Sequence, residues 1–386
     1  MLSANDLRTK LFESLWDIPE GISYNAYLLI DDRTVLVDGF KGMYADLLID
    51  KVKELLGGRR LDYYIVHHGE PDHSGSFPYV VKEFPEVRVL TTDVGLKILR
   101  NLYDVSFNYD VVSDGYELKI GGRTLKFIHA PWLHWPDTYV TYLVEDKVLF
   151  SCDAFGSYGL LTAGYWDRDY GDIHMSLSKR YFANIVARYR GQVIKAIDKL
   201  SKYEVNVIAP AHGPLIGDVG SAIRRYLSWS KPVFDSKVVI IYSSMYGNLE
   251  EAIKYVVKGV EEVRAKAVLM KVPDTAITYV FEELLDAPSI ALGVPTYDGN
   301  VFPYIKLVTH LMTTKMLDGR HIGIVSSGLW APVVEAKLIK DLEEVKAVIE
   351  GKVSILGRAK ESDKEKLIAL GRSLGIKALE LSSTPT

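Results

Sequence analysis

His68-Gly69-Glu70-Pro71-Asp72-His73 brings four metal-ligand side chains into six residues, directly after the apolar run of residues 63–66. A short β-branched and aromatic run of this kind predicts a strand, so the hexapeptide begins the loop at that strand's end. One histidine beside a strand is usually a hydrogen-bonded polar residue, whereas two imidazoles and two carboxylates together are typical of a metal site. This segment therefore indicates metal chemistry in the N-terminal half of the chain.

Three further candidate ligands follow other β-like runs: His134 in APWLHWPDT, Asp153 in LFSCDAFG and His212 in IAPAHGP. Loops at strand ends converge around functional sites, so we expect all of these side chains to meet. One metal ion would not use so many ligands, but two ions that share one carboxylate would. Mixed imidazole and carboxylate donors suit non-haem iron better than structural zinc, so we expect two iron ions. The complete set is His68, Glu70, Asp72, His73, His134, Asp153 and His212.

The composition is that of a folded protein with more than one core. The chain has 386 residues, of which 48% are hydrophobic and 25% charged, and its formal net charge is -4. This charge favours neither nucleic-acid nor membrane binding, and no apolar run is long enough to span a bilayer. The single cysteine, Cys152, excludes an intrachain disulfide and fits a reducing compartment. We expect a cytoplasmic protein.

The pattern of predicted elements changes near residue 235, after a Ser-, Pro- and Asp-containing stretch at 228–237. Before it, strand-like runs alternate with loops and with predicted helices at 43–58 and 179–202. After it, strands alternate regularly with helices at 250–263 and 333–350, which is typical of a parallel sheet covered on both faces. We predict two domains, 1–235 and 236–386. The runs of the first are 24–30, 33–40, 61–68, 87–92, 123–130, 138–144, 147–154 and 205–212, and those of the second are 237–244, 265–272, 288–294, 320–327 and 352–359.

The first strand of the second domain leads through residues 243–248 into a helix. A strand, a hydroxyl- and glycine-containing turn and a helix N-terminus form an anion site, because backbone N–H groups and the helix dipole face the ligand. The segments GVPTYDGN (293–300) and SSGLWAP (326–332) follow the third and fourth strands, at the edge where such sheets bind ligands. A phosphate-bearing cofactor is therefore expected there.

Taken together, these motifs resemble the flavodiiron proteins, or A-type flavoproteins. The first domain is similar to the metallo-β-lactamase fold, whose common hydrolytic motif is H-x-H-x-D-H; here Glu70 replaces the second histidine. The motifs LHWPDT, SCDAFG and PAHGP and the second domain complete the likeness. The resemblance implies an α/β protein with an N-terminal metallo-β-lactamase-like αββα sandwich. It also implies a C-terminal flavodoxin-like, doubly wound, five-stranded parallel sheet.

The resemblance also implies roles for individual residues. His68, Glu70 and His134 would hold one iron, Asp72, His73 and His212 the other, and Asp153 would bridge them. FMN would contact Ser243, Ser244, Met245, Tyr246, Gly247, Asn248, Pro295, Thr296, Tyr297, Asp298, Gly299, Ser327, Gly328, Leu329 and Trp330.

Trp330 is expected to stack on the flavin ring. Leu249 stands where flavodoxins generally carry a threonine, and the missing hydroxyl removes one phosphate hydrogen bond, worth roughly 1 kcal/mol.

The implied activity is reduction of O2 to water, of NO to N2O, or of both. A ferrous pair and a reduced FMN hold two electrons each, which together meet the need of O2. Electrons would come from a separate rubredoxin or from reduced coenzyme F420, and the chain would act as a head-to-tail homodimer or a dimer of dimers. The preferred gas and donor stay open.

Nearby side chains receive plainer interpretations. No catalytic side chain is expected beyond the ligands, with Tyr24 and His174 as candidate pocket residues. His67 is predicted to point to the opposite side of its strand from His68. His129 is predicted to be a hydrogen-bonded core residue, and Cys152 a buried thiol.

Two other classes of function each fit part of the sequence. A zinc hydrolase of the glyoxalase II or lactamase kind conflicts with Glu70 and with the flavin domain. An electron carrier or quinone reductase would use only the second domain and would leave the seven ligands unexplained.

Overall fold

The computed structural model of the chain describes residues 1–330 and 334–382. The chain divides into two compact units, Met1–Ser230 and Lys231–Thr386. The predicted boundary at residue 235 falls between α7 (Val219–Ser230) and β14 (Lys237–Tyr242). Ala331, Pro332 and Val333, at the end of the predicted third flavin loop, lie outside the described residues.

Two sheets form the centre of the first unit. One has the order β1 (Leu2–Asp6), β4 (Ile22–Ile30), β5 (Thr34–Val37), β6 (Tyr63–Ile65), β7 (Arg88–Thr91) and β8 (Asn108–Val111). The other has the order β13 (Val207–Pro210), β12 (Val148–Cys152), β11 (Tyr139–Leu143), β10 (Thr124–His129) and β9 (Glu117–Lys119). A small hairpin joins β2 (Leu11–Phe12) to β3 (Trp16–Asp17). All eight predicted strands of this unit are present.

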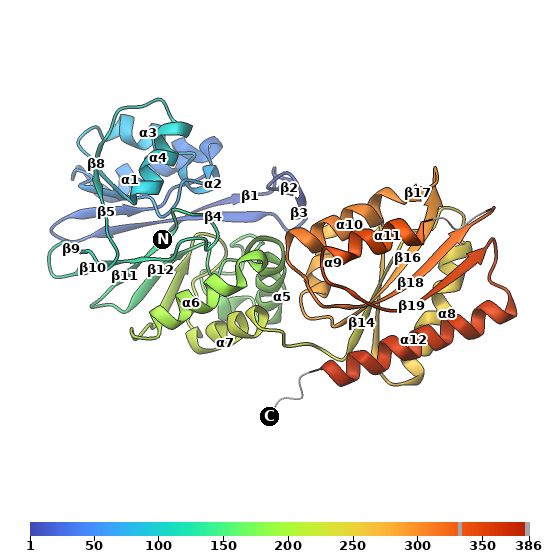
Figure 1. The fold of residues 1–386 in the computed structure, drawn as a ribbon. Helices are drawn as coiled ribbons and strands as arrows, with labels where there is room; N and C mark the ends of the chain where they lie inside the picture. The colour runs from blue at the N-terminus through green and yellow to red at the C-terminus, as the bar shows by residue number, and fades with distance from the viewer. Residues whose placement is uncertain (331–333, 383–386) are drawn as a thin grey trace. The chain divides into compact units, whose positions relative to one another are not determined.

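The core of the first unit lies between these sheets. Val35, Ile65 and Leu90 of one sheet pack in one cluster with Phe127 and Phe150 of the other. Helices cover both outer faces, so the unit is the predicted αββα sandwich (Figure 1). The first face carries η1 (Gly42–Tyr44), α1 (Ala45–Leu56), α2 (Pro71–Ser74), α3 (Phe77–Glu83) and α4 (Asp93–Leu102). The second carries α5 (Asp172–Tyr181), α6 (Arg190–Leu200) and α7, and η2 (Asp167–Asp169) precedes α5.

The helix predicted at 179–202 is interrupted. After α5 the chain forms a π-helical segment, η3 (Phe182–Val186), and a 3-10 turn, η4 (Ala187–Tyr189), before α6 begins. All residues of η3 are buried. π-Helical turns are rare and are often found at functional sites, and this one directly follows Tyr181.

The second unit is a doubly wound sheet, as predicted. Its parallel strands have the order β15 (Lys266–Lys271), β14, β16 (Ser289–Tyr297), β18 (His321–Gly328) and β19 (Val348–Leu356). The short β17 (Asn300–Val301) folds back on the end of β16. Helices α8 (Asn248–Glu262) and α12 (Glu361–Leu381) cover one face of the sheet (Figure 1). The other face carries α9 (Ile277–Leu284), α10 (Pro303–Thr314) and α11 (Glu335–Glu343).

The helix predicted at 333–350 is wrong in its second half. The helix α11 ends at Glu343, and Lys346 adopts a left-handed conformation with φ of 50°. From Val348 onward the chain pairs with β18, beginning opposite His321. Over such a short run, the apolar pattern of a helix is hard to distinguish from that of a half-exposed edge strand. The strand β19 therefore begins earlier than the predicted 352–359.

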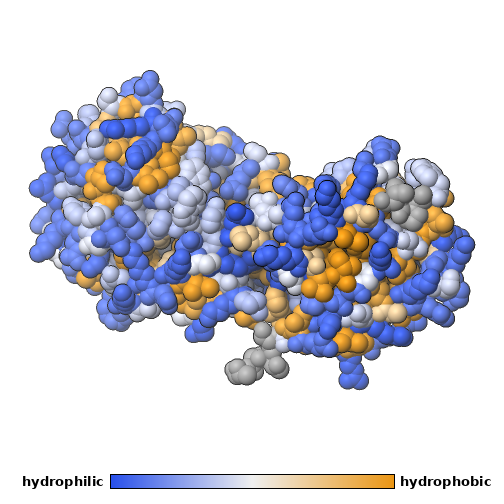
Figure 2. Space-filling model, in the orientation of Figure 1, coloured by the Kyte–Doolittle hydropathy of each residue, from blue (hydrophilic) through white to orange (hydrophobic). Residues whose placement is uncertain are grey.

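On the face drawn in Figure 2, hydrophilic side chains cover most of each unit and apolar ones form separate patches. Within residues 1–330 and 334–382, no helix combines the length and apolar character required to cross a membrane.

Candidate metal centre and flavin cavity

The seven predicted ligands lie at the carboxyl ends of strands in both sheets of the first unit. His68 follows β6, Asp153 follows β12 and His212 follows β13, while His134 lies in the loop between β10 and β11. Glu70 precedes the short α2, which starts at Pro71 and carries Asp72 and His73. Proline suits this first helical position, because its missing N–H would have no partner there.

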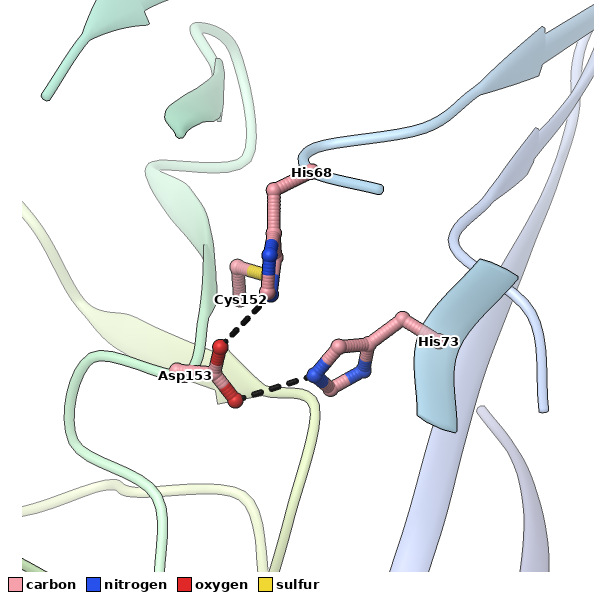
Figure 3. Close-up of side chains that lie close together, drawn as sticks. All are labelled: His68, His73, Cys152 and Asp153. Atoms are coloured by element: carbon pink, nitrogen blue, oxygen red, sulfur yellow. Dashed lines mark hydrogen bonds and ion pairs between the residues drawn. The ribbon is translucent and has the colours of Figure 1, made fainter. Parts of the chain in front are cut away.

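The carboxylate of Asp153 lies at the centre of the cluster. Its Oδ2 is 2.7 Å from His68 Nε2 and 3.4 Å from His134 Nε2. Its Oδ1 is 3.0 Å from His73 Nε2 and 3.3 Å from His212 Nε2. Figure 3 shows this carboxylate between the rings of His68 and His73. Each oxygen therefore faces a different pair of imidazoles.

Glu70 and Asp72 complete the two halves of the cluster. Glu70 Oε2 lies 3.0 Å from His134 Nε2, and Asp72 Oδ2 lies 3.2 Å from His212 Nε2. The donor atoms of His68, Glu70, His134 and Asp153 lie within 4.8 Å of one another, as do those of Asp72, His73 and His212. These two groups match the sets that the resemblance implies. The donor atoms of His68, His73, Cys152 and Asp153 also lie this close together, so the division of the ligands between two ions stays a prediction.

Several buried nitrogen and oxygen atoms of this cluster, which could bind a metal, lack a hydrogen-bond partner. They are both ring nitrogens of His68, both oxygens of Asp72, Nδ1 of His73, Nε2 of His212 and Oδ2 of Asp153. Buried polar atoms are nearly always paired, so a concentration of unpaired ones requires an explanation. Two metal ions would satisfy the inward-facing atoms, and the residues therefore fit such ions.

The charges of the cluster stabilise each other. Burial alone would raise the pKa of Asp153, but the imidazoles of His73 and His68 hold that pKa well below its usual range. Burial would lower the pKa of His73, but Asp72 and Asp153 outweigh it and raise that pKa to about 10. The carboxylates are thus kept ionised, which is the form that binds a metal.

Aromatic side chains line the cluster. Tyr181 Oη donates a hydrogen bond of 2.8 Å to Asp153 Oδ1. The candidate Tyr24 is buried on β4, where its ring lies 5.7 Å from that of His212 and its Oη donates to Asp6 Oδ2 over 3.2 Å. Tyr181 was not predicted from the sequence, because nothing in KRYFAN distinguishes it from a core residue before the π turn is known.

The other candidate pocket residue is His174. His174 is buried in α5 and lines a separate cavity with Arg168, Asp218 and Arg225, which contains none of the seven ligands. Burial lowers the pKa of His174 to about 4. His129 interacts with the Val112 carbonyl at 3.2 Å, and Cys152 is buried.

A cavity of about 290 Å³ lies at the carboxyl edge of the sheet in the second unit. All three predicted flavin loops line it, through Ser244, Met245, Tyr246, Asn248, Pro295, Thr296, Tyr297, Asp298, Ser327, Gly328, Leu329 and Trp330. Leu249 and Gly357 line it as well; Gly357, which follows β19, was not predicted.

The predicted residues that do not line the cavity have local roles. Ser243 Oγ donates to the Val272 carbonyl over 2.8 Å, which fixes the end of β14. Gly247 has φ of 85° just before α8, a conformation that favours glycine, and Gly299 has φ of 67°.

The cavity fits FMN in its polar and its apolar parts. Asn248 and Leu249, the first residues of α8, border it, and Thr296 Oγ1 is buried there without a hydrogen-bond partner. Trp330 is 83% exposed, which leaves its ring free to stack on a ligand. Leu249, in the first turn of α8, is packed in the core of the unit, so apolar packing replaces a phosphate contact at this position.

A metallo-β-lactamase-type sandwich with a ligand set for two metals, joined in one chain to a flavodoxin-type unit, defines a class of two-cofactor redox proteins. Comparisons with known proteins agree. Residues 22–213 match the family described as ODP family beta lactamase. A nitric oxide reductase of Moorella thermoacetica is 33% identical over 74% of this chain and 72% of its own length. A coenzyme F420H(2) oxidase of Methanothermobacter marburgensis is 31% identical over 74% of this chain and 73% of its own length.

A solved structure shares the whole fold. The flavodiiron protein of Giardia intestinalis is 28% identical, with a TM-score of 0.94 over 98% of this chain and 95% of that one. The chain belongs to the flavodiiron protein family. The family expected from the sequence is thereby confirmed, and with it an oxidoreductase whose family employs FMN and two irons.

Proposed function

We propose that this protein reduces O2 to water, NO to N2O, or both, with two non-haem irons in the first unit and FMN in the second. The observation that carries the proposal is the position of Asp153. Its two oxygens face two different sets of imidazole and carboxylate donors, at 2.7–3.4 Å from four Nε2 atoms. A bridging carboxylate between two metals requires this arrangement.

The donor set favours iron. His68, Glu70 and His134 would hold one ion, and Asp72, His73 and His212 the other. Imidazole and carboxylate oxygen without thiolate are typical of non-haem iron, whereas structural zinc prefers cysteine and histidine. When bound, two ferrous ions and reduced FMN would supply the four electrons that convert O2 into two water molecules.

The side chains around the ligands orient them and exclude water. The Nδ1 atom of His212 lies 2.8 Å from the Ser23 carbonyl, which fixes the plane of the ring. Tyr181 holds a proton at Oη, donated to the shared carboxylate of Asp153. Tyr24, Tyr181 and Phe12 pack against the ring of His212. This aromatic wall shields the ring of His212 from water.

We propose the following contacts between FMN and the residues of the flavin cavity. The turn Ser243–Asn248 would receive the phosphate at the start of α8, and Ser244 Oγ already accepts the Gly247 N–H there at 3.2 Å. Trp330 would stack on the ring, while Thr296, Tyr297 and Gly299 would frame its other edge. Pro295 and Asp298, with Ser327, Gly328 and Leu329, would complete the enclosure.

We also propose a separate electron donor, either a rubredoxin or reduced F420, because relatives bear the names rubredoxin-oxygen oxidoreductase and coenzyme F420H(2) oxidase. The proposed assembly is a head-to-tail homodimer, or a dimer of dimers, in the cytoplasm. An active monomer in sedimentation experiments would contradict this assembly.

The test is anaerobic turnover of the iron- and FMN-loaded protein with O2 and NO in parallel, each with a panel of reduced donors. We expect consumption of at least one gas, with water or N2O as the product. A preparation that holds two zinc ions, hydrolyses thioesters and consumes neither gas would instead support a hydrolase.

A further inference from the structure

His67 precedes the ligand His68 but has a different environment. Its Nδ1 lies 2.7 Å from Asp38 Oδ2, and its Nε2 lies 2.8 Å from Thr141 Oγ1. All three side chains are buried. Asp38, His67 and Cys152 have donor atoms close enough for a metal. An ion there would have to replace one of the two hydrogen bonds that the His67 ring already makes, so we assign these contacts a different role.

The three residues come from both sheets of the first unit. Asp38 directly follows β5 and His67 follows β6 in one sheet, whereas Thr141 lies on β11 in the other. A second link crosses the same gap, because the Tyr139 N–H donates to the His67 carbonyl over 3.2 Å. His67 therefore ties the two sheets together directly below the metal centre.

The main chain of His67 is fixed as tightly as its ring. Asp38 Oδ1 accepts the His67 N–H at 2.9 Å, so one carboxylate holds both the backbone and the imidazole. Asp38 adopts φ of 55°, a left-handed conformation that is uncommon for residues other than glycine and needs support from its surroundings. The Asp38 carboxylate accepts from Nδ1 of the ring, and the contact of Nε2 with the Thr141 hydroxyl holds its other side.

We propose that Asp38, His67 and Thr141 form a positioning clamp for His68. The next residue along the chain, His68, must bring its Nε2 to the shared carboxylate, which lies 2.7 Å away. The clamp limits the movement of the backbone that carries it. Groups behind metal ligands typically change metal affinity by about 10–100-fold when they are lost. The inference rests on the proposed two-metal function, but its test measures metal retention rather than gas turnover.

The test is the rate at which a chelator removes metal from the full-length protein loaded with Co(II), followed by the visible d–d bands of the ion. Thr141→Val keeps the shape of the side chain but removes the hydroxyl. We expect metal release at least about 10-fold faster and shifted Co(II) bands, at unchanged FMN content. Thr141→Ser restores the hydroxyl and should return both readouts towards those of the unaltered protein.

The matched control is Tyr139→Phe on the same strand. It removes a buried hydroxyl that donates to the Leu90 carbonyl over 2.7 Å and does not touch the nitrogens of His67. We expect release at the original rate. Unchanged release from Thr141→Val would overturn the clamp, as would equal acceleration in both variants, because a general loosening of β11 would then suffice. If the unaltered protein reduced neither gas but Thr141→Val still accelerated metal release, the proposed function would be refuted and the clamp would stand.

Discussion

Glu70 occupies the position where hydrolases of the same fold carry a second histidine. Its Oε2 lies 3.0 Å from His134 Nε2, on the side of the cluster that faces Asp153 Oδ2. A carboxylate here adds a hard oxygen donor to one ligand set, and a histidine would replace it with a nitrogen donor. The residue at this one position therefore influences which metal ion the centre binds.

We expect Glu70→His to raise the ratio of zinc to iron in protein grown with both metals, because added imidazole favours zinc. Elemental analysis of the purified variant measures this ratio, and FMN content reports on intact folding of the second unit. An iron content equal to that of the unaltered protein would show that Glu70 does not select the metal.

Asp6 shows how a buried carboxylate makes the fold depend on pH. It is fully buried and accepts hydrogen bonds from the Arg8 N–H at 2.7 Å and from Thr9 Oγ1 at 2.6 Å. Burial would raise the pKa of Asp6, but the hydrogen bonds from Thr9 and Arg8 lower it below the ordinary 3.8. The stability that it contributes is therefore present above pH 3.8 and is lost as the pH falls through the lowered pKa.

Asp6→Asn should lower the free energy of unfolding by roughly 1–2 kcal/mol at pH 7, because the charged acceptor is lost. The difference between variant and unaltered protein should shrink as the pH falls below 3.8. Urea unfolding at a series of pH values measures it. A difference that stays constant down to pH 3 would mean that the charge of Asp6 contributes nothing.

At the scale of elements, α8 and α12 approach closely because glycines face each other. A Cβ at Gly371 would lie 2.1 Å from the Val256 carbonyl oxygen, and one at Gly259 would lie 2.1 Å from the Ile368 carbonyl oxygen. Both obstacles are backbone atoms, which cannot move away like a flexible side chain. The pairing of the two helices under the flavin-binding sheet therefore depends on these glycines.

Gly371→Ala should destabilise the second unit by about 3 kcal/mol or more, since overpacking against backbone forces the helices apart. Thermal unfolding followed by far-ultraviolet circular dichroism measures the effect of this substitution and of its control. Gly191→Ala is the control: this helical position in α6 has open space around it, and alanine should stabilise by up to about 1 kcal/mol. Equal effects of the two substitutions would contradict the packing argument.

Some helices and strands could be predicted from the sequence, and others could not. Apolar runs that end in His or Asp located β6, β12 and β13, and with them the ligands, because strand ends fix where loops begin. The π turn after Tyr181 and the start of β19 at Val348 could not be read, since both depend on partners far along the chain. Tyr181 was missed and His174 was placed too near the centre for the same reason: position on a helix does not reveal which loop the helix faces.

At the scale of the whole molecule, the chain consists of two compact units that each enclose their own core. Lys237, at the start of β14, is buried and pairs with Glu283 and Asp286 of the same unit, each at 2.6 Å. The first strand of the flavin unit is thus anchored from within. The sequence-derived domain 236–386 contains all of these partners.

We therefore expect residues 236–386 to fold alone and to bind one FMN. Flavin fluorescence titration and circular dichroism of this fragment measure both properties. A control fragment that starts at residue 248 lacks β14, an inner strand that lies between β15 and β16, and should not fold. If the 236–386 fragment were unfolded, either the predicted domain boundary would be wrong or the second unit would not fold independently.

Asp153 is the single carboxylate shared by the two metal-ligand sets, and the proposed gas reduction depends on it more than on any other residue. The most direct test is rapid-mixing measurement of O2 and NO consumption by reduced Asp153→Ala beside the unaltered protein, with flavin absorbance recorded in the same experiment. We predict that FMN is still reduced by the donor while consumption of both gases falls by at least about 100-fold. Consumption of either gas at the full rate would show that reduction does not occur at this centre.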